Sequence, residues 1–226
     1  MARSTTYYTL IGSLPALPRH FEEAERVPIS LLSLKERLKM LQPHDAEVVE
    51  EMTDFLAWER QPLERTDEDM VSRFNQFMAT VDNRFAQQLI RRAVNVRSLV
   101  AALRCRRLNL DPPGGVDPIA RRIAQGWSHP DFRLGYEYPW IAAVDAQLKS
   151  GEPHDLERTI LDIAWKYTKQ LADQFHFTFE AVVLYLIRWE VVYRWTKRSS
   201  TAGQEKFELL ASEAMGEYAN MFADGT

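Results

Sequence analysis

Two short groups of residues join a histidine to acidic side chains, the combination from which metal sites and acid–base catalysts are built. They are His44 with Glu47 and Glu51, and His154 with Asp155 and Glu157. A metalloprotease would need His-Glu-x-x-His on one helix, and the sequence does not contain that pattern. Both histidines stand beside Asp at the start of a predicted helix, where residues of a helix cap are found. We interpret them as cap-region residues, and the alternative is a hydrolase that uses one of the two groups.

Other patterns of catalysis and cofactor binding are missing from the sequence. Gly114 and Gly115 follow two prolines, but neither Gly-x-x-x-x-Gly-Lys-Ser/Thr nor Gly-x-Gly-x-x-Gly occurs. The Gly-x-Ser-x-Gly pattern of a nucleophilic serine does not occur either. Five histidines and the single Cys105 leave few ligands for zinc, and one cysteine excludes an internal disulfide. We therefore predict a chain that is not an enzyme, with no catalytic residue, no metal site and no cofactor.

The strongest charge signal is a run of arginines with no acid among them. Its members are Arg84, Arg91, Arg92, Arg97, Arg104, Arg106 and Arg107. Residues 83–133 hold ten arginines and three acids, whereas the segments before and after carry a net negative charge. Arginine is the preferred cation at desolvated interfaces, so we predict a basic rim that docks an acidic partner protein. The predicted partner-binding residues are Arg91, Arg92, Arg97, Arg104, Arg106 and Arg107.

Two other interpretations of these arginines stay open. The side chains could line a solvated face and pair with the acidic segments on either side. They could also bind RNA through its phosphates. The sequence pI of about 5.8, the absence of lysine from the arginine run and the lack of an RNA-binding signature argue against nucleic acid. We therefore favour a protein partner.

The spacing of apolar residues predicts an all-α fold, a multi-helix bundle with a short irregular N-terminal leader. Prolines interrupt residues 7–18, and we expect an extended or turn-rich leader whose apolar side chains pack onto the body. The predicted helices begin near Ser30, Asp45 and Thr66 and then cover residues 118–125, 139–149, 155–174, 178–198 and 203–222. The helix from Thr66 is expected to reach Asn109, with or without a kink.

Three local patterns refine this prediction. Thr66 and Asp69 have the spacing of a capping box. One buried apolar stripe is expected to run through Phe85, Leu89, Ala93, Val96, Val100 and Leu103. The proline- and glycine-rich linker over 111–118 is the predicted boundary between a module over 1–109 and a module over 110–226, unless the two form one continuous domain.

Aromatic residues gather in the segment 175–195, where Tyr185, Trp189 and Tyr193 share one helical face. Such a stripe is typical of a protein core. Apolar residues also occupy the other faces, so we expect this helix to be central to the bundle or shared with a partner.

Two features bear on the location of the protein. The N-terminus lacks the pattern of a signal peptide. The most apolar stretch, 181–187, is far shorter than the roughly 20 residues of a membrane-spanning helix. We expect a cytoplasmic protein without a transmembrane segment, either free or peripheral at the inner face of the membrane.

Several segments together resemble a known family. They are GSLPALP at 12–18, NVRSLVAALRCRRL at 95–108, DFRL at 131–134, WKY at 165–167, HFTFE at 176–180 and YLIRWEVVYRW at 185–195. The chain resembles a bacterial family whose genes accompany V/A-type ATPase operons. It looks like a short relative of the C subunit of V/A-type ATPases, which is called the d subunit in eukaryotes. The C subunit has three pseudo-equivalent helical modules, of which this shorter chain would keep one or two.

The resemblance implies a mechanical function. The C subunit is a helical funnel at the foot of the central stalk, which receives the rotor axle and rests on the proteolipid ring. The implied partners are therefore the stalk subunits and that ring. Arg97, Arg104, Arg106 and Arg107, which lie in the matching segment, become candidates for contact with the stalk or with polar loops of the ring. The alternative is a stand-alone helical adaptor that docks some other acidic protein through the same arginines.

Overall fold

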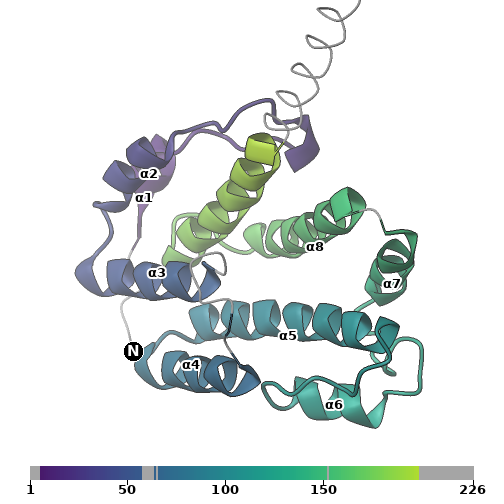
Figure 1. Cartoon of the computed structure of the whole chain (residues 1–226). Coiled ribbons are helices and arrows are strands. Elements are labelled where there is room, and N and C mark those ends of the chain that lie inside the picture. The colour runs from purple at the N-terminus through teal and green to yellow at the C-terminus, as the bar shows by residue number, and fades with distance from the viewer. Residues whose placement is uncertain (1–5, 58–63, 65, 152, 199–226) are drawn as a thin grey trace, which may run out of the picture.

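The structure is a computed structural model that describes residues 6–57, 64, 66–151 and 153–198. These residues form helices joined by turns and loops, and none of them lies in a β-strand, so the fold is all-α as predicted. In Figure 1 the long α5 lies between α4 and α6 on one side and α3 and α8 on the other, with α1 and α2 farther away. The elements are α1 (Tyr8–Ser13), the short 3-10 helix η1 (Phe21–Glu23), α2 (Leu31–Leu38), α3 (Pro43–Leu56), α4 (Asp67–Thr80), α5 (Arg84–Arg107), α6 (Ile119–Gln125), α7 (Ile141–Ser150), α8 (Pro153–Ala172) and a last helix over residues 179–198. The helix predicted over 203–222 lies outside the described residues.

The N-terminal leader differs in part from the prediction. Residues 8–13 form the short helix α1 rather than an extended segment. The physical reason is that Pro15 and Pro18 follow this turn, so no proline inside it removes an N–H. The expected packing of the leader onto the body is confirmed, because Tyr7 and Leu10 are buried.

Side-chain hydrogen bonds tie this leader to the start of α3. The Tyr7 hydroxyl donates to the Asp45 carboxylate and accepts a hydrogen bond from the backbone N–H of Gln42 at 3.2 Å. Asp45 itself lies inside α3 rather than at its start. The helix begins at Pro43, since the first helical position needs no N–H and suits the fixed φ of proline.

The predicted capping box of α4 is confirmed. Thr66 Oγ1 accepts a hydrogen bond from the Asp69 N–H at 3.2 Å, and the Asp69 carboxylate accepts one from the Thr66 N–H at 2.8 Å. The predicted run to Asn109 is broken, because α4 ends at Thr80 and a new helix starts at Arg84. Asn83 caps α5, since its side-chain oxygen accepts a hydrogen bond from the Ala86 N–H at 3.0 Å.

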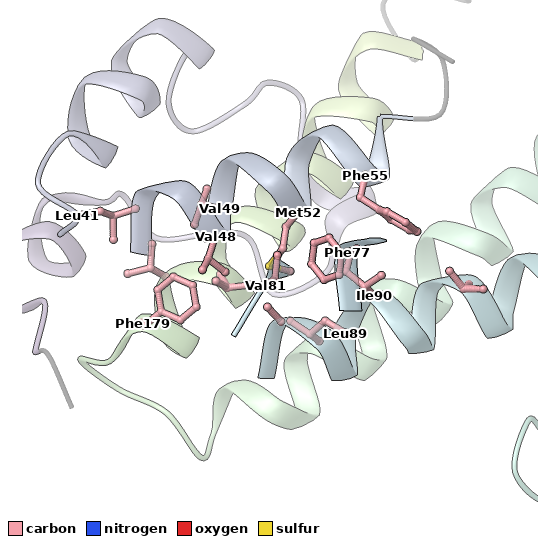
Figure 2. Packing of buried hydrophobic residues seen from close by; sticks show 14 of the residues in the cluster. Leu41, Val48, Val49, Met52, Phe55, Phe77, Val81, Leu89, Ile90 and Phe179 are labelled. Atoms are coloured by element: carbon pink, nitrogen blue, oxygen red, sulfur yellow. The ribbon is translucent and has the colours of Figure 1, made fainter. Parts of the chain in front are cut away.

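The helix α5 joins two hydrophobic clusters. Its N-terminal half contributes Ala86, Leu89, Ile90 and Val94 to the first cluster, with residues of α3, α4 and the 179–198 helix. Figure 2 shows Leu89 and Ile90 among residues of this cluster. The C-terminal half of α5 contributes to the second cluster, with residues of α6, α7 and the 126–139 loop: Leu99, Val100, Ala102 and Leu103. The buried face therefore turns around the helix axis from one half to the other.

The single apolar stripe predicted for this helix is wrong in part. Leu89, Val100 and Leu103 are buried, whereas Phe85, Ala93 and Val96 are half-buried. The physical reason is that the neighbours of the two halves of α5 lie on different sides of it. A helix that meets different partners along its length does not bury one straight stripe.

The 179–198 helix is covered on nearly all faces, as expected for a helix central to the bundle, since no residue from 179 to 196 is exposed. Trp189 is buried, and its indole N–H donates to the Ile29 carbonyl at 2.9 Å. The Tyr185 hydroxyl donates to the Pro15 carbonyl at 2.9 Å. The aromatic face thus holds the N-terminal segment against the body.

The predicted boundary over 111–118 has one buried residue and four exposed ones. Its Val116 is buried in the first cluster, together with Phe179 from the far side of the boundary. The division into modules over 1–109 and 110–226 stays a prediction, and residues from both share a core. None of the helices within the described residues is long and apolar enough to cross a bilayer.

Candidate partner-binding surface

Arg92, one of the predicted partner-binding residues, contacts two aromatic rings. Its guanidinium is 4.7 Å from the centroid of the Tyr138 ring and 5.0 Å from that of Tyr167. The side chain is half-buried, and its buried Nε finds no hydrogen-bond acceptor among the described residues. Cation–π contacts with two rings stabilise such a charge in a partly desolvated place. Arg92 therefore joins α5 to α8 and to the segment before α7.

Arg106 is also engaged within the chain. Its guanidinium donates to the carbonyl oxygens of His129 and Pro130 at 2.8 and 2.7 Å. It lies over the Phe132 ring at 4.5 Å and is 3.8 Å from the Asp145 carboxylate. This half-buried arginine therefore fastens the end of α5 to the 126–139 loop.

The other four predicted residues divide by position along α5. Arg91 is exposed and lies over the Phe74 ring at 5.3 Å, so it faces α4. Arg97 is half-buried near the middle of the helix. Arg104 and Arg107 are exposed in its last turn. The six arginines thus do not form one continuous basic rim.

The end of α5 combines exposed charge with exposed apolar area. Leu108 and Leu110 follow the last turn and are 66% and 55% exposed. Within the described part of the chain, the side chains of Arg104 and Arg107 make no hydrogen bond or ion pair. We call the surface made by Arg104, Arg107, Leu108 and Leu110 the α5 end surface. Its arginines also suit the negative end of the helix dipole.

The geometry of this surface is fixed by a helix-ending motif. Asn109 takes a left-handed conformation with φ 55°. The N–H of Leu110 donates to the Cys105 carbonyl at 2.9 Å, and the N–H of Asn109 donates to the Arg106 carbonyl at 3.1 Å. This pair of bonds is a Schellman motif, with Asn in the place where Gly is commoner.

The neighbouring 126–139 loop is held in one shape by its own contacts. Phe132 and Arg133 have left-handed backbones, with φ 56° and 58°. The Asp131 carboxylate accepts a hydrogen bond from the Arg133 N–H at 2.9 Å and also bonds the His129 ring. Partial desolvation raises the pKa of this carboxyl group, but the hydrogen bonds from His129 and Arg133 together outweigh it and hold the pKa below the usual range. The loop presents Tyr136 with its side chain fully exposed.

The sequence analysis left residues 126–138 between two predicted helices and did not single out Tyr136. Two residues in the sequence were available as signals of a fixed loop, and the first is Gly126. A side chain at that position would overlap the Phe132 carbonyl group, so the fold demands glycine there. Asp131 two residues before Arg133 is a second signal, because Asp commonly bonds the backbone two residues on.

The histidine groups are not assembled into a larger site. His44 and His154 are exposed in the first turns of α3 and α8, close to where the cap-region interpretation puts them. In the ranges that the structure describes, no three His, Cys, Asp or Glu side chains are placed to hold a metal ion.

Comparison with known proteins gives one family. No curated protein and no solved structure matches the chain. The model of a family described as "Protein of unknown function (DUF2764)" matches residues 23–215, which is most of the chain. The protein therefore belongs to the DUF2764 family.

Proposed function

We propose that this protein is a non-catalytic coupling or assembly protein of a V/A-type ATPase, similar to the C subunit, and that the α5 end surface binds the stalk or the proteolipid ring. The proposal rests on the resemblance of segments such as 95–108 and 185–195 to that family. The observation that supports a binding function most directly is the α5 end surface itself. Two arginines without a partner among the described residues stand there beside two exposed leucines.

The composition of this surface suits an acidic partner with some apolar area. Interfaces combine a desolvated apolar centre with a polar rim, and arginine is enriched in them. Leu108 and Leu110 would supply the apolar centre, and Arg104 and Arg107 would supply cations that become partly desolvated on binding.

The rigidity of the surroundings also favours binding. The Schellman motif fixes the two leucines, and the Arg106 contacts fix the adjacent loop that presents Tyr136. A surface that is already ordered loses less conformational entropy when a partner docks.

A second candidate function is a stand-alone adaptor that uses the same surface without a rotary ATPase. The same observation supports it, because exposed arginines and leucines recognise acidic proteins of many kinds. The two functions differ only in the partner, so co-purification separates them.

The test is capture of the stalk subunits and proteolipid ring by the full-length tagged chain. The double variant Arg104→Glu/Arg107→Glu should lose most of the capture. Arg37→Glu/Arg84→Glu is the matched control, since it makes the same charge change at exposed positions away from the α5 end surface. It should capture as the unmodified protein does.

Each failure has a separate meaning. If the unmodified protein captures no ATPase component, the ATPase function is rejected and the stand-alone adaptor remains as the candidate. Equal capture by both double variants would reject the α5 end surface as the contact.

A further inference from the structure

A pocket of about 270 Å³ lies away from the α5 end surface, where the turn after α8 meets α1 and the 179–198 helix. Its walls are mostly aliphatic and aromatic, and one cation reaches it. The residues that matter are Ile11, Leu14, Phe175, Phe177, Tyr185 and Arg188. The exposed His176 also lines the pocket.

Arg188 carries a charge without a close counter-ion. Its Nε donates to the Leu184 carbonyl at 3.3 Å. Among the residues that the structure describes, the guanidinium makes no further hydrogen bond and no ion pair. The side chain is half-buried, and this desolvation lowers the pKa of Arg188, while electrostatic interactions with Tyr185 and Asp173 raise it. A bound anion would stabilise this charge, because a desolvated cation gains most from a paired acceptor.

The hydroxyl group of Tyr185, a second polar group of the wall, is already hydrogen-bonded. The Tyr185 hydroxyl donates to the Pro15 carbonyl at 2.9 Å and holds the segment after α1 in place. Besides the exposed His176 ring, the walls thus offer apolar surface and the Arg188 cation. That combination favours an anion attached to an apolar group over a small hydrated inorganic anion.

The rim of the pocket extends the apolar surface outwards. The rings of Tyr8 and Phe177 lie 4.6 Å apart between centroids, and the two residues are 61% and 42% exposed. The volume is below the range of roughly 300–1,000 Å³ that is usual for small-molecule sites. The pocket is therefore too small for a whole metabolite and fits a single side chain better. The rest of the ligand's chain would then lie over the aromatic rim.

We propose that this pocket binds the C-terminal residue of a partner polypeptide, with an apolar side chain between Leu14 and Phe175 and the terminal carboxylate at Arg188. Capture of a free C-terminal carboxylate is a recurring mode of peptide recognition. The inference is independent of the function proposed for the α5 end surface.

The test is calorimetric titration of the full-length protein with the probe acetyl-Gly-Gly-Phe and with the same peptide as its C-terminal amide. The free acid should bind at least about tenfold more tightly than the amide, as expected for a charge-assisted hydrogen bond. Arg188→Gln should bring the affinity for the acid down to that for the amide. Arg84→Gln, an exposed arginine of α5, is the matched control and should leave the affinity unchanged.

A third probe, 3-phenylpropionate, has the ring and the carboxylate but no peptide chain, and it should bind more weakly than the peptide. Equal binding of these two would overturn the assignment to a chain end. Equal binding of acid and amide, or no binding of either, would overturn the site. If Arg188→Gln does not fold, Ala181→Leu provides a second variant, because Ala181 lines the pocket and a larger side chain there should block the peptide.

Discussion

The guanidinium of Arg106 lies over the ring of Phe132, with 4.5 Å between its Cζ atom and the ring centroid. Phe132 is buried although its backbone has a φ of 56°, which is costly for a residue with a side chain. The same guanidinium donates to the carbonyls of the two residues His129 and Pro130. An arginine that the charge pattern marked as a partner contact therefore stabilises a strained loop beside the α5 end surface.

We expect Arg106→Ala to lower the free energy of unfolding by about 1–3 kcal/mol, because two charge-assisted hydrogen bonds and a cation–π contact are lost. Arg107→Ala is the control. It removes the same charge from the next position, where the side chain is exposed, and should cost less than about 1 kcal/mol. Urea unfolding followed by circular dichroism measures both. Equal stability of the two variants would show that Arg106 does not hold the loop.

Gly126→Ala should destabilise the protein by about 3 kcal/mol or more, or prevent folding, because the added methyl group would overlap the Phe132 backbone. Gly12→Ala provides the comparison. Nothing lies within 4 Å of a methyl group at that position in α1, so the free energy of unfolding should stay unchanged or rise by about 0.5–1 kcal/mol. Thermal and urea unfolding of both variants give the test. A Gly126→Ala protein as stable as the unmodified one would contradict the close contact between Gly126 and the Phe132 backbone.

Ile90→Ala and Leu103→Ala test whether α5 makes the two hydrophobic clusters unfold together. Each side chain is fully buried, Ile90 in the first cluster and Leu103 in the second, and each loss should cost about 2–5 kcal/mol. Both variants should lower the midpoint of one shared transition, since the helix runs without interruption through both clusters.

The readouts are calorimetry and circular dichroism, compared with the exposed Gln88→Ala as a control. Two separate transitions, with each variant shifting only its own, would contradict the shared core. Such a result would support independent modules on the two sides of 111–118.

Tyr7 links stability to alkaline pH. Burial, with the hydrogen bond to Asp45 as a second cause, raises the pKa of Tyr7 from 10.0 to about 12. Between about pH 10 and pH 12, the unfolded chain has lost the phenolic proton while the folded chain keeps it. The free energy of unfolding therefore falls as the pH rises through this range. Below pH 10 the contribution is fully present.

Tyr7→Phe should therefore flatten this decline. It should also cost about 1–2 kcal/mol near neutral pH, because Asp45 and the Gln42 N–H lose their partner. Urea unfolding at a series of pH values between about 8 and 12 measures both effects. Tyr136→Phe, at a fully exposed position, should leave the curve as it is. An unchanged slope for Tyr7→Phe would contradict the assignment.

The helical class and most helix ends follow from local signals in the sequence. The Thr66–Asp69 capping box, the start of α3 at Pro43 and the end of α5 just before Asn109 each depend on residues within a few positions of one another. Backbone hydrogen bonding at a helix end is a local matter. The same kind of signal was available at Asn83, which caps α5, but the apolar spacing on either side of it suggested a continuous helix.

The sequence did not show which parts of the protein pack against each face of α5. Helical periodicity tells which residues share a face but not what lies against that face. Arg92 and Arg106 have the same chemistry as Arg104 and Arg107, yet the first pair packs on aromatic rings and the second faces solvent. The difference comes from Tyr138, Tyr167 and Phe132, which are 26 to 75 positions away in the chain. Contacts between distant segments form only when the helices pack, so this division of the arginines, and the pocket at Arg188, emerge in the assembled bundle.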